Sequence, residues 1–153
     1  GTWRSTDPDK NMISVGDVLT SVLTEKGFGV IHDGTMHDDP SYNGSYQRSA
    51  VTIKKHLSEN PEITICLDIH RDAIEPSASE IIKPTAVING KKAAQVMLVV
   101  GSETGTVIGF PNWKQNFRLA LRFQQTMETM YPGLARALNF CSRKYKHLFL
   151  NKH

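Results

Sequence analysis

Residues 63–72 read ITICLDIHRD, and this stretch decides the fold. Its first seven residues, ITICLDI, are apolar on both faces of an extended chain, which is typical of a central strand in a parallel sheet that is covered on two sides. Within this run, Cys66 is predicted to be a small hydrophobic residue of the core. We therefore expect a buried strand over residues 63–69.

Apolar runs and helical patterns alternate on both sides of this strand. Upstream, apolar residues at helical spacing predict helices over about 15–26 and 45–59, with a short apolar run at 28–31 between them. Downstream, Asn89-Gly90 separates two β-forming runs and predicts a hairpin, and a long helix is expected over about 112–132. The alternation predicts an α/β fold, in which a mostly parallel or mixed sheet has helices on both faces.

The composition is that of one globular domain. The 153 residues are 39% hydrophobic and 22% charged, and no run of about 18 apolar residues is present, so we expect no membrane span in this chain. The net charge is +3, and the basic residues are scattered without interleaved aromatics, so nucleic acid is not an expected partner. The apolar run YKHLFL at 145–150 is followed by three residues only, and the chain opens on Gly1 in place of Met. We therefore expect a single domain, 1–153, that is incomplete at both ends.

Three polar residues, Asp68, His70 and Asp72, alternate at the carboxyl end of the predicted strand, where α/β folds place their sites. One interpretation makes His70 a metal ligand whose other ring nitrogen is oriented by a neighbouring carboxylate. The other makes it a structural histidine that is hydrogen-bonded to an aspartate, and the pattern alone favours neither. The chain has no nucleophile elbow, phosphate loop, dinucleotide fingerprint or HExxH motif.

Further histidines and acids are expected at the same edge of the sheet. A self-contained metal site of His70 with His32 or His37 and one acid is chemically feasible, because zinc needs three or four ligands. The acids available to such a site are Asp33, Asp38, Asp39 and Glu103.

The stretch SYNGSYQRS, 41–49, brings hydrogen-bonding and cationic groups to the start of a helix, and we predict substrate-binding roles for Tyr42, Asn43, Tyr46 and Arg48. Arg48 can clamp a substrate carboxylate through two parallel hydrogen bonds. A solvated helix residue, or a salt bridge to a loop aspartate, explains its position equally well.

Six separated segments stand out in order along the chain: TWRSTDP, VIHDGTMHDDPSYNGSYQRS, LDIHRDA, INGKKAAQVMLVVG, PNWKQNFRLAL and YPGLAR. In order and spacing they resemble the catalytic domain of the stage II sporulation protein P family, and the resemblance covers nearly the whole chain. It implies an amidase-like α/β fold and a zinc-dependent N-acetylmuramoyl-L-alanine amidase, which cuts the amide between the glycan lactyl group and the stem peptide of peptidoglycan.

The same resemblance implies zinc as the cofactor and His70 as one zinc ligand, while Arg48 and the SYNGSY stretch match the family pattern loosely. The family's other ligands come from an HTHTxE-like segment expected before GTWRSTDP. Its catalytic Glu comes from an LLIEVG-like strand expected after YKHLFLNKH. Neither segment is in this sequence, so no general base is predicted among these residues.

The biological setting is likewise implied by the resemblance alone. The family acts in septal thinning and engulfment during sporulation, outside the cytoplasmic membrane and held by an N-terminal anchor, and stage II sporulation protein D is a partner. The alternative to the enzyme is a non-catalytic module that binds wall peptide or a partner through the SYNGSY loop without metal.

Overall fold

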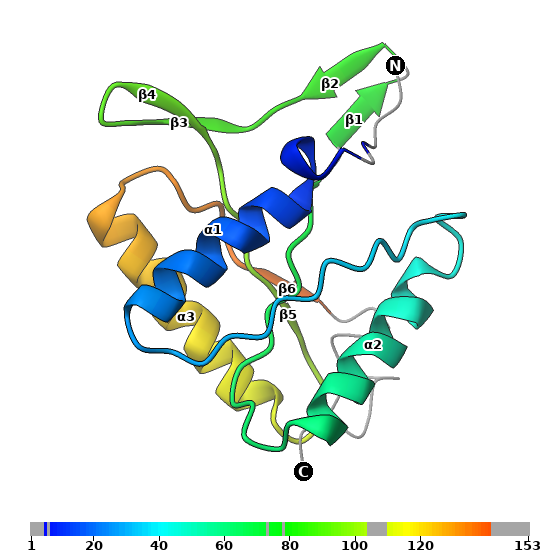
Figure 1. The fold of residues 1–153 in the computed structure, drawn as a ribbon. Helices are drawn as coiled ribbons and strands as arrows, with labels where there is room; N and C mark the ends of the chain where they lie inside the picture. Colours follow the sequence, from blue (N-terminus) through cyan, green and yellow to red (C-terminus); the bar gives the residue numbers. More distant parts are fainter. Residues whose placement is uncertain (1–4, 6, 73, 78, 104–109, 142–153) are drawn as a thin grey trace.

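The computed structural model describes residues 5, 7–72, 74–77, 79–103 and 110–141 (Figure 1). The YKHLFL run lies outside these residues, so the structure does not test what was expected of it. The described part of the chain is a mixture of helices and short strands with little sheet. Its elements are η1 (Pro8–Lys10), α1 (Met12–Glu25), α2 (Ser45–Glu59), β1 (Ile74–Ser77), β2 (Glu80–Ile82), β3 (Thr85–Ile88), β4 (Lys91–Ala94), β5 (Val99–Gly101), α3 (Trp113–Met130) and β6 (Asn139–Cys141).

The strands of the described residues pair into separate two-stranded sheets. β1 pairs with β2 and β3 with β4 in antiparallel fashion, whereas β5 and β6 run parallel with Val100 opposite Phe140. The single larger sheet with helices on both faces that the sequence predicts is not present in this part of the chain. The mixed α/β class is confirmed, and the amidase-like fold is not.

The hairpin predicted at Asn89-Gly90 is confirmed. β3 and β4 flank this dipeptide, and both of its residues have positive φ, 51° and 75°. A two-residue hairpin turn of the favoured type requires positive φ at both central positions, which asparagine and glycine tolerate best. The turn chemistry therefore fixes the register in which Ile88 faces Lys91.

The buried strand predicted over residues 63–69 is wrong for this structure. These residues form no strand, Ile65 and Leu67 are each about half exposed (49% and 51%), and Cys66 is exposed rather than in a core. The apolar run at 28–31 also lies outside the strands. A strand persists only where a neighbour takes up its backbone N–H and C=O groups, and no described segment is paired with either run.

All three predicted helices are confirmed, and local signals explain the ends of α1. α1 begins where the side chain of Asn11 accepts a hydrogen bond from the Ile13 amide at 2.8 Å. It ends two residues before Gly27, whose φ of +85° lets its own amide donate to Thr24 and the Phe28 amide donate to Leu23. This pair of bonds is the Schellman arrangement, for which glycine is the usual residue.

The packed centre lies between α3 and the parallel pair β5–β6. Phe110 is 2% exposed, and Val100, Ala120 and Cys141 are also buried. Phe140 contacts two aromatic rings of α3, those of Trp113 and Phe117. In Figure 1, α2 lies away from the β3–β4 hairpin, at the opposite end of the drawn chain. None of the helices in the described ranges is long and apolar enough to cross a membrane.

Candidate functional site

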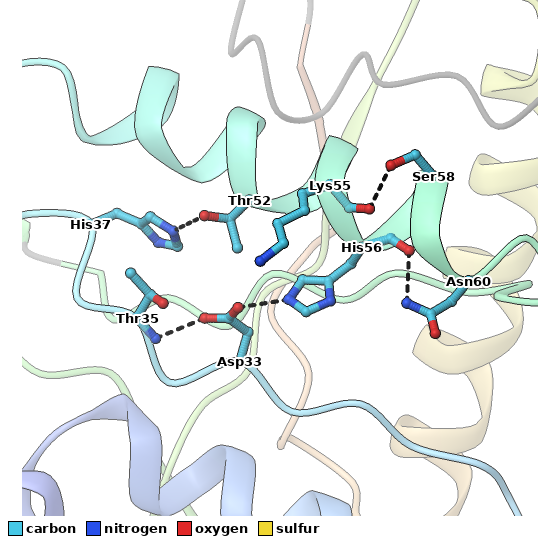
Figure 2. Close-up of polar contacts among 8 residues, drawn as sticks. All are labelled: Asp33, Thr35, His37, Thr52, Lys55, His56, Ser58 and Asn60. Atoms are coloured by element: carbon cyan, nitrogen blue, oxygen red, sulfur yellow. Dashed lines mark hydrogen bonds and ion pairs between the residues drawn. The ribbon is translucent and has the colours of Figure 1, made fainter.

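The loop between α1 and α2 is fastened along one face of α2. Thr52 and His56 are four residues apart and therefore lie on the same stripe of the helix. The Thr52 hydroxyl is hydrogen-bonded to Nε2 of His37 at 2.8 Å, and Nε2 of His56 is hydrogen-bonded to Oδ2 of Asp33 at 2.7 Å (Figure 2). Two turns of α2 thus hold two separate points of the loop.

Asp33 is the charged anchor of this attachment. Its other carboxylate oxygen accepts the Thr35 backbone amide at 2.8 Å (Figure 2). Hydrogen bonds from Thr35, and then from His56, hold the pKa of Asp33 well below its ordinary value. The carboxylate therefore stays ionised at neutral pH.

Arg48 lies one turn before Thr52 and also faces the loop. Its Nε donates to the His37 carbonyl at 2.7 Å, its Nη1 to the Asn43 carbonyl at 3.3 Å, and its Nη2 to the Ser41 carbonyl. All three guanidinium nitrogens thus donate to backbone oxygens of one loop. A substrate-carboxylate clamp at Arg48 stays a prediction.

A cavity of about 360 Å³ opens between this loop and α2. Its wall mixes apolar and polar side chains from both segments, so it suits a small ligand with both characters. The lining residues are Thr35, Met36, His37, Asp39, Arg48, Val51 and Thr52.

His70 lies beside a carboxylate, as both interpretations of the sequence require. Its Nε2 is 2.8 Å from Oδ2 of Asp68. The hydrogen bond with Asp68 raises the pKa of His70 above its ordinary value. Because Asp68 occupies Nε2, a metal ion at this residue would bind Nδ1.

The predicted tyrosines come together with His70, although 24 residues separate Tyr46 from it in the sequence. The Tyr46 ring lies 6.0 Å from the His70 ring, centroid to centroid, and 6.3 Å from the Tyr42 ring. The two tyrosine hydroxyls are 3.4 Å apart. Asn43 joins the group through its carbonyl, which Arg48 holds. The site residues predicted from the sequence therefore form one neighbourhood.

The self-contained metal site of His70 with His32 or His37 is wrong. His32 is hydrogen-bonded to Asp17 of α1 at 3.1 Å, whereas His37 contacts α2 and His70 contacts Asp68. Within the ranges that the structure describes, no group of three or more His, Cys, Asp and Glu residues lies close enough to hold one ion. The two histidines of the loop contact different helices, His32 with α1 and His37 with α2, so they do not share one site.

The other acidic residues considered as ligands do not come together at one point within the described ranges. Asp72 receives a hydrogen bond from Arg136 at 3.1 Å, so it serves as an ion-pair partner. Asp39 lines the cavity beside the loop, and Glu103 follows β5.

The contacts of Thr52 and His56 with the loop were not predicted from the sequence. Both lie at helical spacing from Arg48, which is a visible signal, but their partners are 15 and 23 residues away in an irregular loop. Periodicity identifies the face of a helix and cannot identify which loop residue will meet it.

A family model described as "Stage II sporulation protein P" matches residues 1–152. The chain belongs to the stage II sporulation protein P family. The protein of that name from Bacillus subtilis (strain 168) is 30% identical over 85% of this chain and 33% of its own length. The chain thus spans about a third of the length of this relative. No solved structure matches it.

Membership of the stage II sporulation protein P family makes this a sporulation protein and confirms the resemblance seen in the six sequence segments. A zinc site needs three or four ligands, and the described residues bring together no such group; His70, which is hydrogen-bonded to Asp68, is the imidazole that the family resemblance assigns to zinc.

Proposed function

We propose that this protein is part of a zinc-dependent peptidoglycan hydrolase that cleaves the N-acetylmuramoyl-L-alanine amide bond during sporulation. The observation that carries the proposal is the meeting of the Asp68–His70 pair with Tyr46 and Tyr42. A carboxylate-held imidazole beside hydrogen-bonding aromatic side chains suits metal-assisted hydrolysis of a polar substrate. The family membership supports the sporulation setting.

In this proposal each residue has a distinct role. His70 is one zinc ligand, and Asp68 fixes the orientation of its ring through Nε2. The metal, when bound, polarises the amide carbonyl and activates a water. Tyr42, Asn43 and Tyr46 bind the stem peptide next to the scissile amide. The general base is not assigned to any residue of this chain.

The setting of the reaction rests on the family resemblance alone. We place the protein outside the cytoplasmic membrane at the sporulation septum, with peptidoglycan as its substrate and stage II sporulation protein D as its partner. Zinc is the proposed cofactor, and the amidase-like arrangement of the sheet is part of the same proposal.

A second candidate is a non-catalytic module that binds wall peptide or a partner protein. Two observations favour it. The described side chains form no group of three or more metal ligands, and α2 holds the loop in place beside a cavity. Such a module needs the SYNGSY surface and no metal.

Zinc content separates the two candidates. In the protein as its gene encodes it, we expect stoichiometric zinc, and we expect His70→Ala to lose it together with release of new amino termini from purified peptidoglycan. His32→Ala is the matched control, because His32 also pairs with an aspartate, but with Asp17 of α1. A metal-free protein that binds peptidoglycan without releasing amino termini would establish the module instead.

Replacing Asp68 tests the site more finely. Asp68→Asn keeps the shape of the side chain and removes its charge, so zinc affinity is expected to fall about 10- to 100-fold, as is usual for the loss of a group that orients a metal-bound histidine. Competition with a chromogenic chelator measures this affinity. Asp17→Asn, which alters the His32 pair in the same way, is the control and should leave affinity unchanged. Equal affinities for Asp68→Asn and the wild type would remove Asp68 from the site.

A further inference from the structure

We propose that Arg48 is a positioning residue, which holds the loop of residues 37–43 in the shape that brings Tyr42 beside Tyr46 and His70, and that it does not bind substrate itself. What the tyrosines bind depends on the function proposed above. The shape of the loop does not, so it can be measured without substrate.

The guanidinium is used to hold backbone oxygens at three points of the loop. It donates to the carbonyls of His37, Ser41 and Asn43 through three different nitrogens. Irregular backbone has no ladder partner, so its carbonyls need donors from side chains or water. A planar fork of five N–H groups can serve three fixed acceptors, whereas a lysine ammonium is a single point charge on a flexible stem.

The turn into α2 is built around the same side chain. Gly44 has a φ of +84°, and a Cβ added there would lie 3.1 Å from Nη1 of Arg48. The Ser45 amide donates to the Tyr42 carbonyl at 3.0 Å, and Ser45 is buried. The guanidinium therefore lies against the turn that carries Tyr42 and Asn43.

The neighbouring attachments of the loop do not replace Arg48. Thr52 and His56 hold the loop at His37 and Asp33, upstream of the tyrosine turn. Among the described contacts, Arg48 is the side chain of α2 that reaches Ser41 and Asn43, on either side of Tyr42. Its loss should release this part of the loop while the upstream part stays in place.

The connection to the proposed site runs through the aromatic rings. Tyr46 belongs to the first turn of α2 and contacts His70 directly, whereas Tyr42 belongs to the loop and contacts Tyr46. A released loop would remove Tyr42 from this group and leave Tyr46 in place. Arg48 thus acts on the site through Tyr42.

Hydrogen exchange of the substrate-free protein tests the proposal. The Ser45 amide is the reporter, since its bond to Tyr42 closes the turn. Arg48→Ala and Arg48→Lys should both speed its exchange about tenfold or more, because neither side chain can serve three carbonyls. Lys54→Ala, a charge loss on the same helix, should leave it unchanged. Slow exchange at α3 amides such as that of Ala120 shows that each variant is folded.

Wild-type protection of Ser45 in Arg48→Lys or Arg48→Ala overturns the proposal and favours the carboxylate clamp. If the protein has amidase activity, steady-state kinetics also distinguish a positioning role of Arg48 from a carboxylate clamp. If Arg48 acts through Tyr42, Arg48→Lys should raise KM no further in a Tyr42→Ala background, whereas a clamp predicts that the two effects add, and additive effects would count against positioning. Faster exchange in a protein without amidase activity would refute the proposed function and leave the role of Arg48 standing.

Discussion

At the scale of single residues, four histidines of this chain illustrate how one side chain takes different roles. His32, His56 and His70 each pair with an aspartate, and His37 pairs with a threonine. His70 is the one whose ring also meets Tyr46. The sequence identified it through its alternation with two aspartates, and only the fold separates it from histidines with the same kind of partner.

The carboxylate of Asp33 should make the protein sensitive to acid. Because the pKa of Asp33 is lowered in the folded state, its contribution to stability is present above the unfolded pKa of about 4 and is lost as the pH falls further. We expect Asp33→Asn to lower the free energy of unfolding by about 1 to 2 kcal/mol at pH 6, a range reduced for solvent screening. Urea denaturation at pH 6 and pH 3 should show this difference shrinking in acid. A difference that stays constant or widens would contradict the assignment.

Gly16 gives His32 its place against α1. Gly16 is buried, and an added Cβ would lie 2.7 Å from Cε1 of the His32 ring. In an open helix the change from glycine to alanine is stabilising by roughly 0.5 to 1 kcal/mol. Here we expect Gly16→Ala to destabilise by about 1 to 3 kcal/mol, because the ring must move. Thermal unfolding measures the effect.

The double variant Gly16→Ala/His32→Ala is the control for this prediction. With the ring removed, the added methyl group has space, so Gly16→Ala should become neutral or stabilising in the His32→Ala background. The same loss in both backgrounds would show that the methyl group meets something other than His32.

At the scale of elements, the sequence predicts what is encoded locally. Gly27 ends α1 and Asn89-Gly90 turns the β3–β4 hairpin, and both signals are readable because the residues involved are neighbours in the sequence. The pairing of β5 with β6 was not predicted, since it joins Val100 to Phe140 across 40 residues. Residues 63–69 are apolar, but their composition does not show which segment would pair with them. Their assignment to a strand therefore depended on assuming a partner strand elsewhere in the chain.

Gly27 should be less replaceable than Gly29, the next glycine along the chain. An L-residue at its φ of +85° is strained, so Gly27→Ala is expected to lower stability by about 1 to 2 kcal/mol. Gly29→Ala is the matched control, because an added Cβ there meets open space and no positive φ is involved. Chemical denaturation of the two variants gives the comparison. Equal losses would mean that the end of α1 does not depend on the left-handed glycine.

At the scale of the whole molecule, the chain has a small packed centre and much exposed apolar surface. Burial is concentrated where α3 meets β5 and β6, whereas α1 exposes Val18 (64%) and the segment after it exposes Phe28 (61%). The candidate site lies on the loop, α2 and residues 68–70, which make few contacts with that centre. Candidate site residues could be chosen from the sequence because they are polar residues in a family pattern, but their mutual geometry could not be predicted.

This surface predicts how the 153-residue chain behaves in solution. Large exposed apolar areas favour association. We expect the chain to bind a hydrophobic dye and to self-associate as its concentration rises, and we expect Val18→Ser with Phe28→Ser to reduce both. Dye fluorescence and sedimentation velocity measure these properties. A monomer that binds no dye at any concentration would contradict the prediction.

The three attachments of the loop to α2 depend on which side chains of the helix face the loop. Arg48, Thr52 and His56 face the loop because each follows the last by four residues. One residue inserted between Thr52 and His56 would rotate the histidine by about 100° away from Asp33. Evolution can therefore exchange side chains on this stripe one at a time, while insertions and deletions in the family should collect in the loop and spare the helix.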